Sequence, residues 1–217
     1  AEARSARRRV DLAATQDGST ARSSAHGRTG PHSAVLTVIE SLARALHAAH
    51  ESGVVHRDVK PGNVMITPSG EPVLLDFGLA RLADETFDLT LTGAALGTPV
   101  YMSPEQVRGQ RDQIGRAADI WSLGVTAYEC LTLRTPFDAT TREGIYRRIL
   151  LEPPTPLRET DPSLPRGLDA VLATALHKDP AARYASAAEF ADDIAAVRDS
   201  LPTRAKRIGS LERTLLW

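Results

Sequence analysis

The sequence predicts an α+β fold that is mainly helical, with one short β-hairpin beside a polar loop. Two short apolar runs, 64–66 and 73–75, flank a turn rich in proline and glycine, which is the pattern of a hairpin. Apolar residues at helical spacing predict helices on both sides of it. The 217 residues are 42% hydrophobic and 24% charged, which is the composition of a globular domain with room for a core.

The first predicted helix runs from His32 to Gly53, where the glycine ends it. Its apolar residues recur every three or four positions and mark one buried face. These residues are Val35, Val38, Ile39, Leu42 and Leu46. We expect this helix to serve as scaffold for the polar loop that follows it.

That loop places three different polar side chains, Asp58, Lys60 and Asn63, within six residues. A Pro-Gly pair inside it prevents a regular helix. A hairpin folds its two outer ends back to the same side, so Asn63 before the first strand and Asp76 after the second should meet at its open end. An amide oxygen and a carboxylate placed there suit Mg²⁺ bound to phosphates.

The remaining helices are predicted from periodicity and capping patterns. Residues 117–133 are apolar almost all round, which is typical of a buried central helix, and we expect Cys130 to be buried in it. Thr140 with Glu143, and Ser186 with Glu189, form capping-box patterns that open two later helices. Another helix is predicted over 168–176, whereas 79–96 has no clear period.

Composition limits the classes of function. A net charge of −1 argues against a dedicated nucleic-acid surface, and a single cysteine excludes an internal disulfide framework. No apolar run approaches the roughly 20 residues of a membrane span. Residues 1–32 are basic and lack any period, so we interpret them as a disordered or non-homologous segment before a domain at 33–200. Residues 201–217 are interpreted as a basic tail or linker, clipped at its end.

Five motifs in register carry a resemblance. They are His56-Arg57-Asp58 with Asn63, Asp76-Phe77-Gly78, the run 97–105 as a whole, Ser103-Pro104-Glu105 within it, and the run 119–124. Together they resemble the signature set of protein kinases. Lys60 and Thr98 are similar to the residues at these positions in the serine/threonine branch. The motif sequences as a whole resemble those of bacterial kinases of the eukaryotic (Hanks) type. The resemblance covers roughly 33–200, the large C-terminal lobe, and 1–32 hold no glycine-rich or lysine motif of a small N-terminal lobe.

The resemblance implies a catalytic role for each polar residue, with ATP and Mg²⁺ as cofactors. Asp58 would accept the proton of the substrate hydroxyl, and Lys60 would steady the γ-phosphate. Asn63 and Asp76 would hold Mg²⁺ on the nucleotide. Thr98 would bridge Asp58 and Lys60, and Met65 would form part of the floor under adenine.

The resemblance also implies structural and regulatory roles. Thr90 and Thr92 stand where related kinases carry phosphothreonines, and Arg57 would pair with such a phosphate. Asp119 would grip the backbone of the His-Arg-Asp loop, and Glu105 would pair with Arg183. His56, Phe77 and Gly78 would complete the structural set.

Three hypotheses follow: a serine/threonine kinase recorded as its catalytic lobe, a non-catalytic kinase-like binding or scaffold module, and a gene fragment without independent function. The kinase hypothesis implies protein substrates with Ser or Thr acceptors and a dimer for autophosphorylation. It also implies a cytoplasmic location, with the kinase domain tethered to the inner face of a membrane in a longer parent protein. The polar set favours a catalytic ancestor, because a scaffold would not need all four side chains together. The missing small-lobe motifs favour weak or no activity of this chain by itself.

Overall fold

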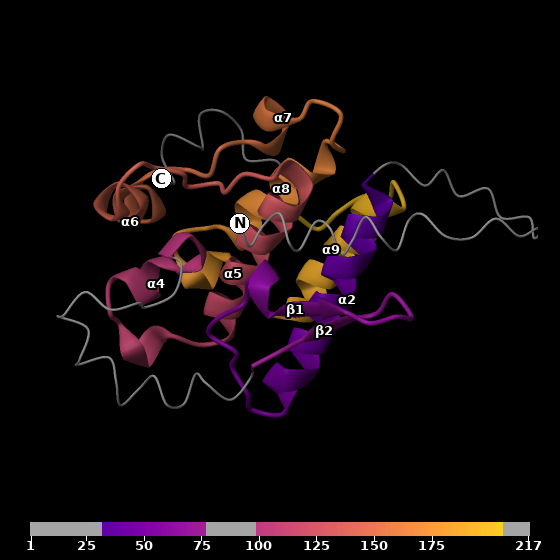
Figure 1. Ribbon diagram of the computed structural model, residues 1–217, viewed down its shortest axis with the longest axis horizontal. Coiled ribbons are helices and arrows are strands. Elements are labelled where there is room, and N and C mark those ends of the chain that lie inside the picture. The colour runs from indigo at the N-terminus through magenta and orange to yellow at the C-terminus, as the bar shows by residue number, and fades with distance from the viewer. Residues whose placement is uncertain (1–31, 77–98, 206–217) are drawn as a thin grey trace, which may run out of the picture.

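The computed structural model describes residues 32–76 and 99–205, which form a helical body with a two-stranded hairpin against it (Figure 1). The α-helices are α2 (Ser33–Glu51), α4 (Pro104–Val107), α5 (Arg116–Thr132), α6 (Arg142–Leu151), α7 (Leu157–Thr160), α8 (Gly167–Ala175) and α9 (Ala187–Arg198). Short 3₁₀ turns cover Pro61–Asn63, Pro99–Tyr101, Arg111–Gln113 and Pro180–Ala182. None of the described helices combines the length and apolar character that crossing a bilayer requires.

Helix α2 lies alongside α9 and buries one face against α9, α5 and β2 (Figure 1). The face is formed by Leu36, Ile39, Leu42, Ala43, Leu46 and His50. Val35 and Val38, which we expected in this face, lie at its margin and are half-buried against the core. The helix ends before Gly53, whose φ of +78° favours glycine.

The hairpin consists of β1 (Val64–Ile66) and β2 (Pro72–Leu74), paired antiparallel with Met65 opposite Val73. The second strand begins one residue earlier than its apolar run predicts. A further hydrogen bond from Leu75 N to Asn63 O, at 2.8 Å, continues the pairing beyond the strand ends. The open end of the hairpin is therefore held together at Asn63 and Leu75.

Helix α5 is the central helix of the core, and all of its residues from Ala118 to Tyr128 are buried. Gly124 allows α8 to pack closely, since a Cβ at this position would lie 3.1 Å from the Cβ of Ala175. The expectation for Cys130 was wrong: it is exposed, because the last turn of α5 emerges from the core and keeps only Leu131 buried.

The two capping patterns had different outcomes. The cap of α6 is Thr141 and not Thr140, because the Thr141 hydroxyl accepts the Gly144 N–H at 3.0 Å and leaves Glu143 exposed in the first turn. Ser186 caps α9 as predicted, accepting the Glu189 N–H at 3.2 Å. A capping pattern read one residue out of register still marks the start of a helix, but not the residue that caps it.

Residues 201–205, at the start of the predicted tail, are held to α9 by one buried carboxylate. Asp193 accepts hydrogen bonds from Arg204 N at 2.7 Å, Ala205 N at 2.8 Å and the Tyr184 hydroxyl at 2.8 Å. Burial and the neighbouring Asp193 charge raise the pKa of Tyr184 well above its usual range, so the hydroxyl stays protonated and donates.

Candidate active site

Two polar side chains of the loop before β1 donate to one carboxylate oxygen of a third, Asp58. The Lys60 ammonium donates to Asp58 Oδ2 at 2.8 Å, and the Asn63 amide nitrogen donates to the same oxygen at 3.0 Å. Asn63 Nδ2 also donates to the backbone oxygen of Asp58 at 2.8 Å. Asp58 itself is 54% exposed, so its carboxylate is held from one side and open to solvent on the other.

The hairpin places Asp76 at the same end as Asn63. Asp76 follows Leu75, whose amide is bonded to Asn63, so Asn63 and Asp76 both lie at the open end of the hairpin. Asp76 is exposed and has a left-handed φ of 66°, which turns the chain sharply after β2. Phe77, Gly78, Thr90, Thr92 and Thr98 lie outside the described residues.

The backbone of the His-Arg-Asp loop, residues 56–58, is held by Asp119, at the start of α5. Its carboxylate accepts the N–H of His56 at 2.8 Å and the N–H of Arg57 at 2.6 Å. A third bond, at 2.8 Å, joins it to Nε2 of His50, at the end of α2. Asp119 is fully buried, and the three hydrogen bonds compensate for the loss of its hydration.

His56 connects this loop to the hairpin. Its Nε2 lies 2.9 Å from the Leu75 oxygen, and its Nδ1 accepts the Asp58 N–H at 3.3 Å. Because Nδ1 accepts, the ring proton lies on Nε2 and is donated to the Leu75 oxygen. The buried ring thus fixes Asp58 relative to the end of β2, directly before Asp76.

Gln106 also holds this loop, through the Arg57 carbonyl. Its amide nitrogen donates to the Arg57 oxygen at 3.0 Å, and its amide oxygen accepts the Ser103 N–H at 2.9 Å. Arg57 has a left-handed φ of 67°, a strained conformation for a side chain of this size. The bonds from Asp119 and Gln106 on either side of this residue keep it in that conformation.

Glu105 and Arg183 form a buried, two-pronged ion pair. The guanidinium donates to both carboxylate oxygens at 2.8 Å, and one of its nitrogens also donates to the Ala117 oxygen at 2.8 Å. The side chains are 1% and 0% exposed. The pair therefore ties α4 to the segment before α9 at the base of α5.

Lys178 lies beside this pair and over two stacked rings. Its ammonium is 4.0 Å from the centre of the Phe137 ring and 5.1 Å from that of Trp121. Burial, with the positive charge of Arg183 adding to it, lowers the pKa of Lys178 to about 7. The aromatic faces favour the charged form and oppose this shift.

Sequence reasoning missed two residues of this network, His50 and Gln106. His50 continues the buried spacing of Leu42 and Leu46, so its position on the apolar face was a signal of a buried polar role. Gln106 stands three residues after Ser103, which is a capping-box pattern. Both signals were present in the sequence, but neither indicates the partner across the fold.

Comparison with known proteins identifies the family of the chain. A family model described as "Protein kinase domain" matches residues 12–193. The chain belongs to the protein kinase family. It is a Hanks-type serine/threonine protein kinase domain by homology, and the fold is protein kinase-like, with a helical body and a small hairpin that correspond to the large lobe.

Several bacterial kinases are similar to this kinase domain. It is 42% identical over 163 residues to "Serine/threonine-protein kinase PknA" of Mycobacterium tuberculosis, covering 75% of this chain and 36% of the relative. It is 38% identical over 204 residues to PknB of the same species, covering 92% and 32%. The chain thus spans about a third of the length of these relatives.

A solved kinase structure shares the fold. The crystal structure of Rad53 residues 1–466 in complex with AMP-PNP superimposes with a TM-score of 0.60 at 26% identity. The superposition covers 77% of this chain and 41% of the Rad53 chain.

Replacing Glu105 tests how much the buried Glu105–Arg183 pair contributes to the stability of the fold. We expect Glu105→Gln to lower the free energy of unfolding by about 3–5 kcal/mol, because it leaves the Arg183 charge buried without its counter-ion. Urea denaturation of the purified chain measures this. As a matched control, Glu152→Gln removes an exposed partner of Arg148 and should change stability by about 0–1 kcal/mol. Equal effects of the two variants would contradict a structural role for the buried pair.

The lowered pKa of Lys178 predicts a pH dependence of stability. Between about 7 and the ordinary value of 10.5 the unfolded chain binds the lysine proton and the folded chain does not, so folding becomes more favourable as pH rises through this window. Lys178→Met should remove that part of the rise. Urea denaturation of both proteins at several pH values tests it, and parallel profiles would show that Lys178 keeps its proton when folded.

Proposed function

We propose that this chain carries the catalytic lobe of a serine/threonine protein kinase that transfers the γ-phosphoryl group of ATP to serine or threonine hydroxyls of proteins. The observation that supports it is the joining of Asp58, Lys60 and Asn63 by hydrogen bonds at the hairpin end that also presents Asp76. Phosphoryl transfer requires mainly positioning and charge neutralisation, and these four side chains supply both.

Asp58 is the proposed catalytic base. Lys60 and Asn63 occupy its Oδ2, and the described residues make no hydrogen bond to its Oδ1. Oδ1 can therefore accept the proton of a substrate hydroxyl as that oxygen attacks the phosphorus. Lys60 places a positive charge beside the reacting oxygens, where it stabilises the negative charge of the phosphoryl group.

Asn63 and Asp76 are the proposed ligands of Mg²⁺. Both hydrogen bonds of Asn63 use its amide nitrogen, which leaves Oδ1 to face a cation. Asp76 adds an exposed carboxylate at the same end of the hairpin. One carboxylate and one amide oxygen suit a cation that completes its shell with phosphates and water. Mg-ATP, when bound, supplies the phosphoryl group and neutralises charge on the phosphates.

Met65 and the residues around the hairpin complete the proposed nucleotide site. Met65 is 41% exposed and paired with Val73, which is 39% exposed, so the hairpin presents apolar surface for adenine. We further propose that Thr98 favours serine and threonine acceptors and that phosphates on Thr90 or Thr92 pair with Arg57. The same proposal includes protein substrates and dimerisation for autophosphorylation. It also includes a cytoplasmic location, with the longer parent protein anchored to a membrane.

The metal site can be tested with Mn²⁺ and ATP in place of Mg-ATP. We expect paramagnetic broadening of amide signals around Asn63 and Asp76 in the NMR spectrum of the full chain, because Mn²⁺ takes the same oxygen ligands. Asp76→Asn should remove this local broadening, whereas Asp138→Asn, an exposed aspartate in the loop before α6, should leave it. Broadening that persists in Asp76→Asn would refute the proposed ligand set.

Phosphoryl transfer by the purified chain should be weak or absent. The glycine-rich cover and the paired lysine that kinases use on the nucleotide have no counterpart in residues 1–32. Incubation with radiolabelled ATP, Mg²⁺ and a generic protein substrate measures the transfer. Robust labelling that Asp58→Asn abolishes would overturn the expectation of weak activity and would strengthen the assignment of the base.

A further inference from the structure

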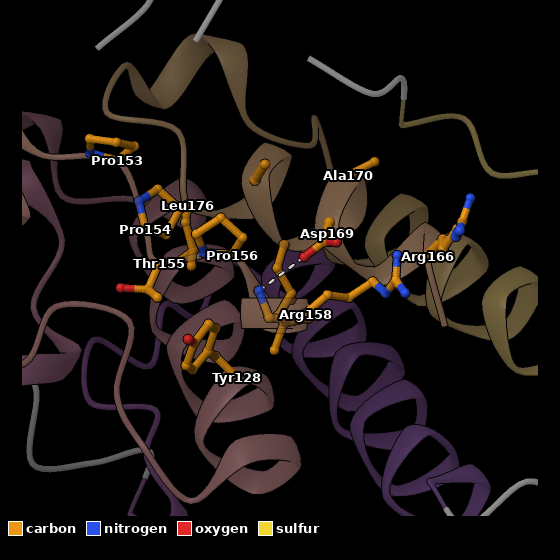
Figure 2. A pocket seen from close by; sticks show the side chains of 13 residues that line it. Tyr128, Pro153, Pro154, Thr155, Pro156, Arg158, Arg166, Asp169, Ala170 and Leu176 are labelled. Carbon is orange, nitrogen blue, oxygen red and sulfur yellow. Dashed lines mark hydrogen bonds between the residues drawn. The ribbon is translucent and has the colours of Figure 1, made fainter. Parts of the chain in front are cut away.

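A cleft of about 220 Å³ opens in the described part of the chain outside the candidate active site (Figure 2). Its walls come from the end of α5, the proline-rich segment 153–156, and helices α7 and α8. Most of this surface is apolar. The body of the cleft is lined by the Tyr128 ring, Pro154, Pro156, Leu172, Ala173 and Leu176.

The walls of the cleft are fixed by hydrogen bonds around it. The Tyr128 hydroxyl lies 3.2 Å from that of Thr160, which orients the ring. Asp169 accepts the Leu157 N–H at 2.9 Å, which joins α8 to α7 (Figure 2). Prolines add stiffness to the opposite wall because their φ angle is fixed. The cleft is therefore largely pre-formed, as small-molecule sites usually are.

Two arginines give the cleft a cationic end. Arg158 and Arg166 both line it, and Figure 2 shows their side chains extending toward the same side. No described carboxylate forms an ion pair with either guanidinium. Within 32–76 and 99–205, Arg158 donates one bond, at 3.3 Å to the Pro162 oxygen, and its buried Nε has no hydrogen-bond partner. A buried, unsatisfied donor on a cation favours an acceptor that the chain itself does not supply.

We propose that this cleft binds a small organic carboxylate with an apolar body. The body would lie against Tyr128 and the prolines, and the carboxylate would accept hydrogen bonds from Arg158 and Arg166, since guanidinium groups match carboxylates in shape and charge. Asp169 also lines the cleft, so two positive charges face one negative charge. A single negative charge on the ligand balances this set.

The proposed site is separate from the catalytic loop. Tyr128 lies nine residues after Asp119 on α5, which corresponds to about 14 Å along a helix. The two sites therefore share α5 but no lining residue, and binding can be measured without any kinase activity.

Binding can be tested with 4-phenylbutyrate and its neutral analogue 4-phenylbutanamide. We expect saturable shifts of amide signals from α7 and α8 in the NMR spectrum, with the carboxylate bound at least about tenfold more tightly than the amide. Arg158→Gln and Arg166→Gln should each weaken binding of the carboxylate by about tenfold. Arg147→Gln, which removes an exposed arginine of α6 outside the cleft, should leave it unchanged.

A filling variant locates the ligand independently of charge. Ala173 is half-buried and lines the cleft, so Ala173→Phe should occupy the space and abolish binding while the far-ultraviolet circular dichroism stays unchanged. If Ala173→Phe does not fold, the two arginine variants decide the question alone. The proposal is overturned by equal affinity for carboxylate and amide, by binding that survives both arginine variants, or by no saturable binding.

Discussion

The buried carboxylate of Asp119 is the interaction on which the geometry of the catalytic loop depends. A charge without hydration is unfavourable unless it is hydrogen-bonded, and Asp119 accepts bonds from two consecutive amides of the loop and from His50. Its place in the first turn of α5 adds the favourable end of the helix dipole. With the Gln106 bond to the Arg57 oxygen, these bonds fix the left-handed conformation of Arg57, so the position of Asp58 depends on a residue 61 places along the chain.

Helix α5 transmits that constraint to the rest of the described body. At its start, Asp119 holds the catalytic loop, and the Ala117 oxygen accepts from Arg183 of the buried pair. Gln106, which follows Glu105 of that pair, donates a hydrogen bond to the Arg57 oxygen of the loop. Loop, α4 and the segment before α9 are thus joined through short contacts to one helix. A kinase needs such a frame, because small displacements of a catalytic group reduce transfer greatly.

The sequence was sufficient for the parts of the site that depend on local pattern. Two apolar runs around a turn predicted the hairpin, and the hairpin explains why Asn63 and Asp76 lie at the same end. Contacts across the fold were beyond such reasoning. Nothing near Asp193 in the sequence indicates that it binds the amides of Arg204 and Ala205, and nothing near Cys130 shows that the last turn of α5 leaves the core. Periodicity shows which residues avoid water, but not which element covers them.

The hairpin also indicates which end of a nucleotide the described residues would hold better in the proposed site. Alternation along β2 buries Leu74 in the core and turns Val73 and Leu75 to the other face, where Met65 is paired with Val73. These three side chains are 37–41% exposed, so the described residues cover only one side of an adenine placed on them. The phosphate end is different, since Asp58, Lys60 and Asn63 are already bonded together and need no further cover to be positioned. Burial of apolar surface contributes most of the affinity for a flat base, whereas fixed charges orient the phosphates. In the proposed site, the described residues would therefore align the phosphates for transfer, whereas tight binding of the base would require further apolar surface.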